Sequence, residues 1–190
     1  NVINNNKKLD ERIILLEHHN NLGCGKAMAT GYKWARDNDL DIIVRLDGDG
    51  QMDIKDLTNI IEPVVSGEVD YSKGNRLSTG KVYQIMPKTR YFGNAILSFL
   101  TKIASGYWHV ADSQSGYTAM NKNAVQMLDW DKLYKGYGHP NDILVKLNVC
   151  NFRVRDVAIN PIYNVAERSS MKIGKVIFTI SYLLFCRFIW

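Results

Sequence analysis

The stretch VRLDGDGQMD, Val44 to Asp53, places three aspartates within seven residues, directly after an apolar run that begins at Ile42. Such a run is typical of a buried strand, and ligands in open α/β sheets bind just beyond the carboxyl ends of strands. Two carboxylates one residue apart can reach one hard cation, and Mg²⁺ or Mn²⁺ accepts such oxygen ligands together with substrate phosphates. We therefore interpret Asp47 and Asp49 as candidate metal ligands rather than as a solvated turn, and Asp53 as a helix N-cap.

Strand and helix signals alternate on both sides of this stretch. The spacing of apolar residues predicts strands at Arg12–His18, Asp41–Leu46 and Val69–Arg76, and helices at 26–38 and 54–65. This alternation is typical of an α/β fold, with a mostly parallel, Rossmann-like sheet and helices on both faces.

The second half of the chain is less regular. Apolar spacing predicts helices at about 91–104 and 142–149 and a strand at 152–159. Between them, the segment GYWHVADSQSGYTAM (106–120) is polar and aromatic, and it matches neither a helix nor a clean strand.

The composition sets broad limits on function. A chain of 190 residues with 46% hydrophobic and 23% charged residues fits one globular domain. The net charge of +5 suits an anionic partner such as a nucleotide, a lipid phosphate or a membrane surface, but it is not the dense basic stripe of a nucleic-acid binder. The three cysteines form no CxxC pair, which favours a reducing, cytosolic setting, and the four histidines show no metal-ligand spacing.

Rival loop motifs fail at particular residues. A calcium EF-hand loop that starts at Asp47 requires Gly at its sixth position, where Met52 stands, and Glu at its twelfth, where Thr58 stands. The GCGK segment is not a phosphate-binding P-loop, because Asn20 occupies the place of its first glycine. A dinucleotide-binding fingerprint from Gly23 ends on Met28 rather than on Gly or Ala.

The C-terminal segment VIFTISYLLFCRFIW (Val176–Trp190) leaves two interpretations open. Fifteen mostly apolar residues are fewer than the roughly 20 that span a bilayer, and Arg187 interrupts them. One interpretation is a buried amphipathic helix; the other, which we favour because apolar residues occur on every side, is a juxtamembrane helix or the start of a transmembrane helix. We thus expect a domain at 1–170 and a separate amphipathic segment at 171–190.

The ordered motifs NLGCGKAMATGYKWA, DIIVRLDGDGQMD, GNR and DSQSGYTAMNK resemble family 2 glycosyltransferases of the GT-A fold. The resemblance runs from about Arg12 to Ser170 and is strongest to dolichol- or polyprenyl-phosphate mannosyl- and glucosyltransferases. The family's first strand, with its Pro-x-x-Asn-Glu segment, has no counterpart here. We therefore expect the chain to begin within the second βα unit, with a nucleotide pocket that is incomplete in this fragment.

The resemblance implies a donor site around the aspartates. Asp47 and Asp49 match the D-x-D element that holds Mg²⁺ or Mn²⁺ and the diphosphate of the sugar nucleotide, and Gln51 matches a neighbouring polar contact. A metal there neutralises the leaving diphosphate.

Other family motifs imply further substrate contacts. Asn21, Gly23 and Lys26 match the turn beside the nucleotide, where small residues let the backbone approach the ligand. Arg76 matches the arginine of the family's G-S-R segment, and Arg90 lies where further basic residues contact phosphate, a task that suits the planar guanidinium.

The acceptor side is implied by two segments. Asp112, Ser115 and Gly116 match the D-x-x-S-G segment that lines the donor sugar and the acceptor, with Asp112 a candidate catalytic residue. Asp142 falls where hydroxyl-glycosylating relatives place a catalytic carboxylate. A hydroxyl acceptor needs a general base, whereas a polyprenyl phosphate is already an anion; a dispensable Asp142 therefore favours the lipid phosphate.

These observations predict a metal-dependent, inverting glycosyltransferase at the cytoplasmic face of the cell membrane. It moves a hexose from a nucleotide-diphosphate sugar to a polyprenyl phosphate or a growing glycan, such as an envelope polysaccharide, and binds no nucleic acid. Two alternatives remain: a nucleotidyltransferase of similar fold, and a non-catalytic domain that binds a nucleotide sugar.

Overall fold

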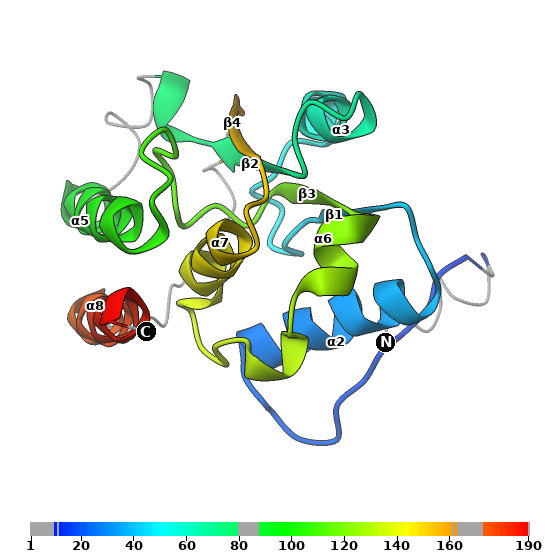
Figure 1. Cartoon of the computed structure of the whole chain (residues 1–190), viewed down its shortest axis with the longest axis horizontal. Helices are drawn as coiled ribbons and strands as arrows, with labels where there is room; N and C mark the ends of the chain where they lie inside the picture. The colour runs from blue at the N-terminus through cyan, green and yellow to red at the C-terminus, as the bar shows by residue number, and fades with distance from the viewer. Residues whose placement is uncertain (1–9, 11, 80–87, 161, 163–172, 190) are drawn as a thin grey trace.

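The computed structural model describes residues 10, 12–79, 88–160, 162 and 173–189. Its helices and strands follow in the order α2 (Cys24–Asp37), β1 (Ile42–Arg45), α3 (Leu57–Val65), β2 (Tyr71–Asn75), α5 (Lys88–Ser105), β3 (Thr118–Asn121), α6 (Lys122–Met127), α7 (His139–Val149), β4 (Val154–Ala158) and α8 (Ile173–Ile189). Short 3-10 turns lie at Ile54–Asp56, Leu77–Thr79 and Trp130–Lys132. Figure 1 shows helices on both sides of a central sheet, which confirms the α/β class.

The described sheet is mixed rather than mostly parallel. Its strand order is β1-β3-β2-β4. β3 runs antiparallel to both β1 and β2, whereas β2 and β4 are parallel. β1, β2 and β4 therefore share one direction, as predicted, but β3 was missed: it spans only four residues and is too short to show a period within the polar segment 106–120.

The predicted strand at Arg12–His18 is wrong. These residues form no strand in the structure, and Ile14 and Leu16 are 53% and 42% exposed. An apolar run becomes a strand only where a neighbour offers backbone partners. In the described sheet β1 is an edge strand that pairs with β3 alone.

The two faces of the sheet are covered by different helices. On β3, Met120 packs in the core that lies under α2, α6 and α7, while its neighbour Ala119 packs in the core under α3, as the alternation of side chains along a strand requires. Tyr32 of α2 stacks on Trp130 with ring centroids 4.3 Å apart. Asp53 caps the turn that leads into α3, accepting a hydrogen bond from the backbone N–H of Lys55 at 3.0 Å, as predicted.

A third cluster joins α5, α7 and α8, which lie together in Figure 1. Leu97 of α5, Val145 of α7 and Ile180 and Leu184 of α8 are buried against one another. α8 therefore packs on the domain, and no helix in the described part of the chain has the length and apolar character needed to cross a membrane.

Candidate functional site

The acidic loop begins after the end of β1, and its aspartates Asp47 and Asp49 make different hydrogen bonds. Asp47 accepts two hydrogen bonds on Oδ1 from Arg45, from Nε at 3.1 Å and from Nη2 at 2.8 Å. Asp49 accepts a bond from the backbone N–H of Gln51 at 3.0 Å, closing a tight turn in which Gly50 has a φ of 73°. Both carboxylates follow the carboxyl end of β1, as predicted from the sequence.

The donor set fits a hard cation that brings further ligands. Among the described residues, no three His, Cys, Asp or Glu side chains cluster as a metal site. Asp47 and Asp49 thus supply at most two protein ligands, and the Asp47 side chain is 41% exposed. Mg²⁺ and Mn²⁺ bound by one or two carboxylates complete their shell with substrate phosphates and water.

The loop before β3 lies directly against the first of these aspartates. A Cβ atom added to Gly116 would stand 2.2 Å from Oδ2 of Asp47 and 2.9 Å from Nη2 of Arg45. Only a residue without a side chain permits this approach. The D-x-D and D-x-x-S-G motifs, far apart in the sequence, therefore lie side by side.

Arg76 and Asp112, predicted as separate site residues, bind each other. Arg76 donates from Nε to Oδ2 of Asp112 at 2.7 Å and from Nη2 to Oδ1 at 3.0 Å, and its backbone N–H adds a third bond at 3.2 Å. Asp112 is fully buried. Burial raises the pKa of Asp112, but the charge and hydrogen bonds of Arg76 outweigh it and hold that pKa below its usual value.

Two charged residues that the sequence reasoning missed support the same loop. Lys73 is fully buried on β2, and its Nζ donates to the backbone carbonyl of Ser115. Burial lowers the pKa of Lys73 to about 8. Its neighbour in the parallel register on β4, Asp156, accepts a bond from the backbone N–H of Ala111 at 2.6 Å, and burial raises the pKa of Asp156. The available signal was the lysine within the buried strand β2.

The predicted nucleotide turn has a clear local structure. The side chain of Asn21 accepts a bond from the backbone N–H of Gly23 at 2.9 Å. Gly23 has a φ of 88°, and a Cβ there would stand 2.6 Å from the carbonyl oxygen of Lys135. The turn thereby seats the start of α2 against the segment before α7. Lys26 lies half-buried in the first turn of α2.

Asp142 lies in the first turn of α7 and is fully buried. Its Oδ2 accepts a bond from the backbone N–H of Tyr134 at 2.8 Å, and its Oδ1 accepts one from Nε of Arg187 at 2.6 Å. In this conformation both oxygens of the candidate base are bonded within the protein, to α8 and to the loop before α7. Arg90 lies in the first turn of α5, and its side chain is outside the described residues.

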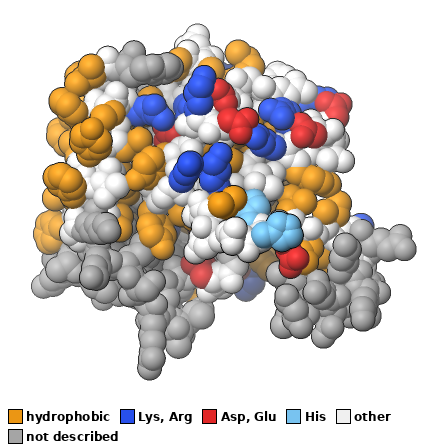
Figure 2. Space-filling model, turned by 90° about the horizontal axis from the view of Figure 1, so that it is seen from below, with side chains coloured by type: hydrophobic (Ala, Val, Ile, Leu, Met, Phe, Trp, Pro, Cys, Tyr) orange, Lys and Arg blue, Asp and Glu red, His pale blue; other side chains and the backbone are white. Residues whose placement is uncertain are grey.

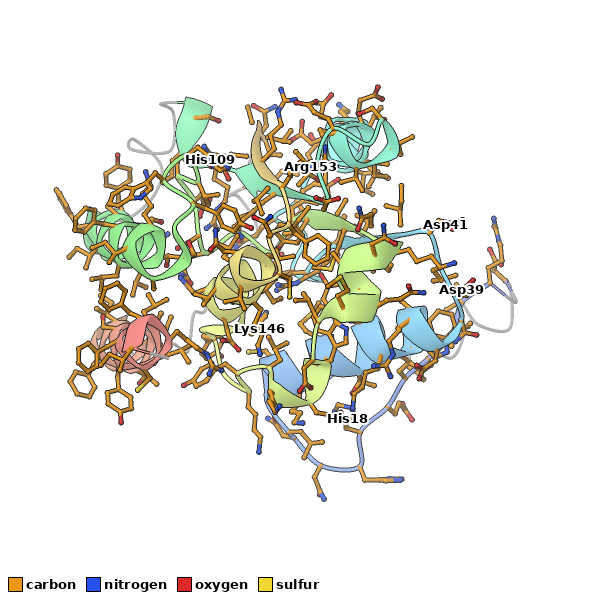
Figure 3. The ribbon with its side chains drawn as sticks, in the orientation of Figure 1. His18, Asp39, Asp41, His109, Lys146 and Arg153 are labelled. Carbon is orange, nitrogen blue, oxygen red and sulfur yellow. The ribbon has the colours of Figure 1, made fainter. Side chains whose placement is uncertain are left out.

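Three of the four histidines make hydrogen bonds within the domain. His18 bonds Thr30 at 2.9 Å, and Nε2 of His109 donates to the carbonyl of Val154 at 2.8 Å; both are labelled in Figure 3. Nδ1 of His139 donates to the carbonyl of Gly136 at 3.0 Å. Burial and the charge of Arg45 lower the pKa of His139 to about 4, so this imidazole is neutral at pH 7.

The amino-acid sequence matches a known protein family over most of the residues described above. The family model described as Glycosyl transferase family 2 matches residues 1–128, which include the acidic loop, Arg76 and the Asp112–Gly116 loop. The chain belongs to glycosyl transferase family 2. The resemblance inferred from the motifs is thereby confirmed.

Two curated relatives of this family 2 chain act on lipid phosphates by name. It is 34% identical over 170 residues to a UDP-N-acetylglucosamine–dolichyl-phosphate N-acetylglucosaminyltransferase of Methanococcus voltae, covering 88% of this chain and 67% of that protein. It is 25% identical over 168 residues to an undecaprenyl-phosphate mannosyltransferase of Micrococcus luteus, covering 88% and 68%. The family 2 chain thus spans about two thirds of these relatives.

Solved structures confirm the GT-A fold of this family 2 chain. Glucosyl-3-phosphoglycerate synthase from Mycobacterium tuberculosis, crystallised with Mn²⁺ and UDP-glucose, matches with a TM-score of 0.60 at 15% identity. The match covers 95% of this chain and 58% of that one. A complex of the same synthase with Mn²⁺, UDP and phosphoglyceric acid gives a TM-score of 0.62 at 15% identity, covering 95% and 57%.

Proposed function

We propose that the protein transfers a hexose or N-acetylhexosamine from a nucleotide-diphosphate sugar to a polyprenyl phosphate, with inversion at the sugar carbon and dependence on Mn²⁺ or Mg²⁺. The names of the two curated relatives support the lipid-phosphate acceptor and the sugar class. The Mn²⁺ and UDP-glucose held by a protein of the same fold support the donor and the metal.

Asp47 and Asp49 hold the donor end of the reaction. When bound, a divalent cation neutralises the charge of the leaving diphosphate. The two carboxylates would fix the position of that charge, and the backbone of Gly116, which lies against Asp47, forms the adjoining wall of the site. Lys73 and Arg76 hold this wall in place through Ser115 and Asp112.

The ion pair of Asp142 with Arg187 is the single observation on which we base the choice of a phosphate, rather than a hydroxyl, as the acceptor. Both candidate bases are committed: Asp142 to Arg187 and Tyr134, and Asp112 to Arg76. A hydroxyl acceptor must lose a proton to a base, whereas a phosphate monoester carries the nucleophilic oxygen already ionised. In the proposed step, a phosphate oxygen forms a bond to C1 of the sugar as the bond from C1 to the diphosphate oxygen breaks. Asp112 and Asp142 then serve as positioning residues.

We also propose that the protein works at the cytoplasmic face of a membrane. On α5 the exposed residues Phe92, Ile96, Phe99 and Ile103 follow helical spacing, and on α8 so do Phe178, Tyr182, Phe185 and Ile189. We call these two rows the apolar rim. Figure 2 shows hydrophobic side chains gathered along its left edge, the side on which α5 and α8 lie. Monomeric soluble proteins rarely expose contiguous apolar areas of this kind.

The test is a transfer assay with the full chain. Each of a panel of nucleotide sugars is offered with Mn²⁺ or Mg²⁺ and either a polyprenyl phosphate or a polyprenol, which has the same lipid but a hydroxyl in place of the phosphate. Sugar transfer to the phosphate and not to the hydroxyl is expected. Transfer to the polyprenol, release of pyrophosphate from a nucleoside triphosphate, or binding of a donor without turnover would each contradict the proposal.

A further inference from the structure

Arg45 lies beside Asp47, the first of the two candidate metal ligands. It is the last residue of β1, two positions before Asp47, and its side chain is only 9% exposed. The guanidinium makes two hydrogen bonds to one oxygen, Oδ1 of Asp47. The same guanidinium lies beside the backbone of Gly116, because a Cβ there would approach Nη2 to 2.9 Å. The guanidinium of Arg45 therefore lies between the two motifs that form the proposed donor site.

The pair has a direct consequence for metal binding. Oδ1 of Asp47 carries part of the negative charge that a cation would coordinate. Nη2 of Arg45, 2.8 Å away, already neutralises that charge. A divalent cation on Asp47 would meet this positive charge within a few ångströms, in a site that is partly shielded from water, where like charges repel strongly. The cation must therefore displace the guanidinium from this oxygen or bind more weakly.

An arginine displaced here still has a suitable partner. The diphosphate of a nucleotide sugar bound through the metal lies next to Asp47 under the proposed function, and the planar guanidinium fork matches phosphate oxygens bidentately. Leaving Arg45 with no anion would be costly, because its side chain is largely buried.

We infer that Arg45 is a counter-ion that changes partners: it holds Asp47 while the site is empty and binds the donor diphosphate once a metal takes Asp47. This inference rests on the proposed metal and donor at this site. It makes metal binding weak without nucleotide and strong with it, since the nucleotide supplies the new partner for Arg45. A purely structural ion pair has no such coupling.

The experiment measures Mn²⁺ binding by isothermal titration calorimetry with the full chain, first alone and then with UDP. Arg45→Gln removes the competing charge, so Mn²⁺ alone should bind about fivefold more tightly. With Mn²⁺ saturating, UDP should bind about tenfold more weakly, because a charge-assisted contact is lost. Arg45→Lys, which keeps the charge without the fork, should leave Mn²⁺ affinity near wild type yet weaken UDP.

Controls separate this inference from the proposed function. Arg36→Gln removes an arginine whose partner is the exposed Asp37 on α2, and it should change neither constant. If Arg45→Gln binds Mn²⁺ and UDP with the affinities of the wild type, or binds both more weakly, the inference is overturned while the metal site stays intact. A wild-type chain that binds no Mn²⁺ even with UDP overturns the proposed metal site. If Arg45→Gln does not fold, Arg45→Lys decides: equal UDP affinity refutes the partner exchange, and weaker UDP binding at unchanged Mn²⁺ affinity supports it.

Discussion

Nε of Arg187, near the end of α8, donates a hydrogen bond of 2.6 Å to Oδ1 of Asp142, in the first turn of α7. Asp142 is fully buried, while the Arg187 side chain is 26% exposed. The carboxylate of Asp142 thus ties the C-terminal helix to the domain. Its second oxygen, bonded to Tyr134, ties down the loop before α7.

Substitution at either end of this pair should reveal its role. Asp142→Asn retains the shape and the bond to Tyr134 but loses the charge, and should lower the free energy of unfolding by about 2 kcal/mol. Arg187→Gln should produce a similar loss. Chemical denaturation measures the stability, and transfer assays below the unfolding transition measure the activity.

The comparison of the two variants tests the positioning role. If Asp142 only positions α8, both variants should retain transfer to a similar degree. Abolished transfer in Asp142→Asn together with near-normal transfer in Arg187→Gln would instead identify Asp142 as the general base and a hydroxyl as the acceptor.

Removal of either D-x-D carboxylate should abolish metal-dependent binding. Asp47→Asn and Asp49→Asn each lose a charged oxygen ligand, and we expect both donor binding in Mn²⁺ and sugar transfer to fall at least 100-fold. Asp53→Asn is the matched control in the same loop, since Asn also caps helices well and should leave both near wild type. Unchanged transfer by the Asp47 and Asp49 variants would remove the metal assignment.

The sequence predicted the elements that have long periodic patterns of apolar residues. α3, α5 and the strand before Asp47 followed from apolar spacing. The bonds of Lys73 to Ser115, of Arg76 to Asp112 and of Asp156 to Ala111 did not, because they join groups brought together only by the pairing of β2 with β3 and with β4. The Arg12–His18 run shows the converse limit: an apolar pattern becomes a strand only where its backbone pairs with a neighbouring strand, and these residues pair with none in the described sheet.

Gly116→Ala should distort the donor site without unfolding the domain. The added methyl would lie 2.2 Å from Oδ2 of Asp47, so either the loop or the carboxylate must move. We expect binding of UDP with Mn²⁺, measured by calorimetry, to weaken about tenfold or more, a loss of roughly 1.4 kcal/mol. Gly31→Ala on α2, where an added Cβ meets nothing within 4 Å, is the control and should bind normally. Equal affinities would show that the loop adapts freely.

We expect His139 to make the free energy of unfolding sensitive to acid. Burial lowers its folded-state pKa from 6.5 to about 4. Between these values the unfolded chain binds a proton that the folded chain does not, so this contribution is present above pH 6.5 and is lost as the pH falls toward 4. The stability advantage of wild type over His139→Gln, from urea unfolding, should therefore shrink by up to about 3 kcal/mol across this window. The exposed His19→Gln variant is the control, and parallel profiles for wild type and His139→Gln would contradict the assignment.

The apolar rim on α5 and α8 should direct the protein to membranes. Phe178 and Phe185 are 76% and 61% exposed on α8, so replacing both with Ser removes apolar area without disturbing the buried contacts of Ile180 and Leu184. Because buried apolar area sets the strength of interfacial binding, the double variant should lose most of its cosedimentation with anionic lipid vesicles, while keeping its melting temperature. Met127→Ser, at a residue 63% exposed on α6, tests whether any exposed apolar residue has this effect and should cosediment as the wild type does. Retention of the double variant on vesicles would place the membrane contact elsewhere, and a wild type that stays in the supernatant would exclude one.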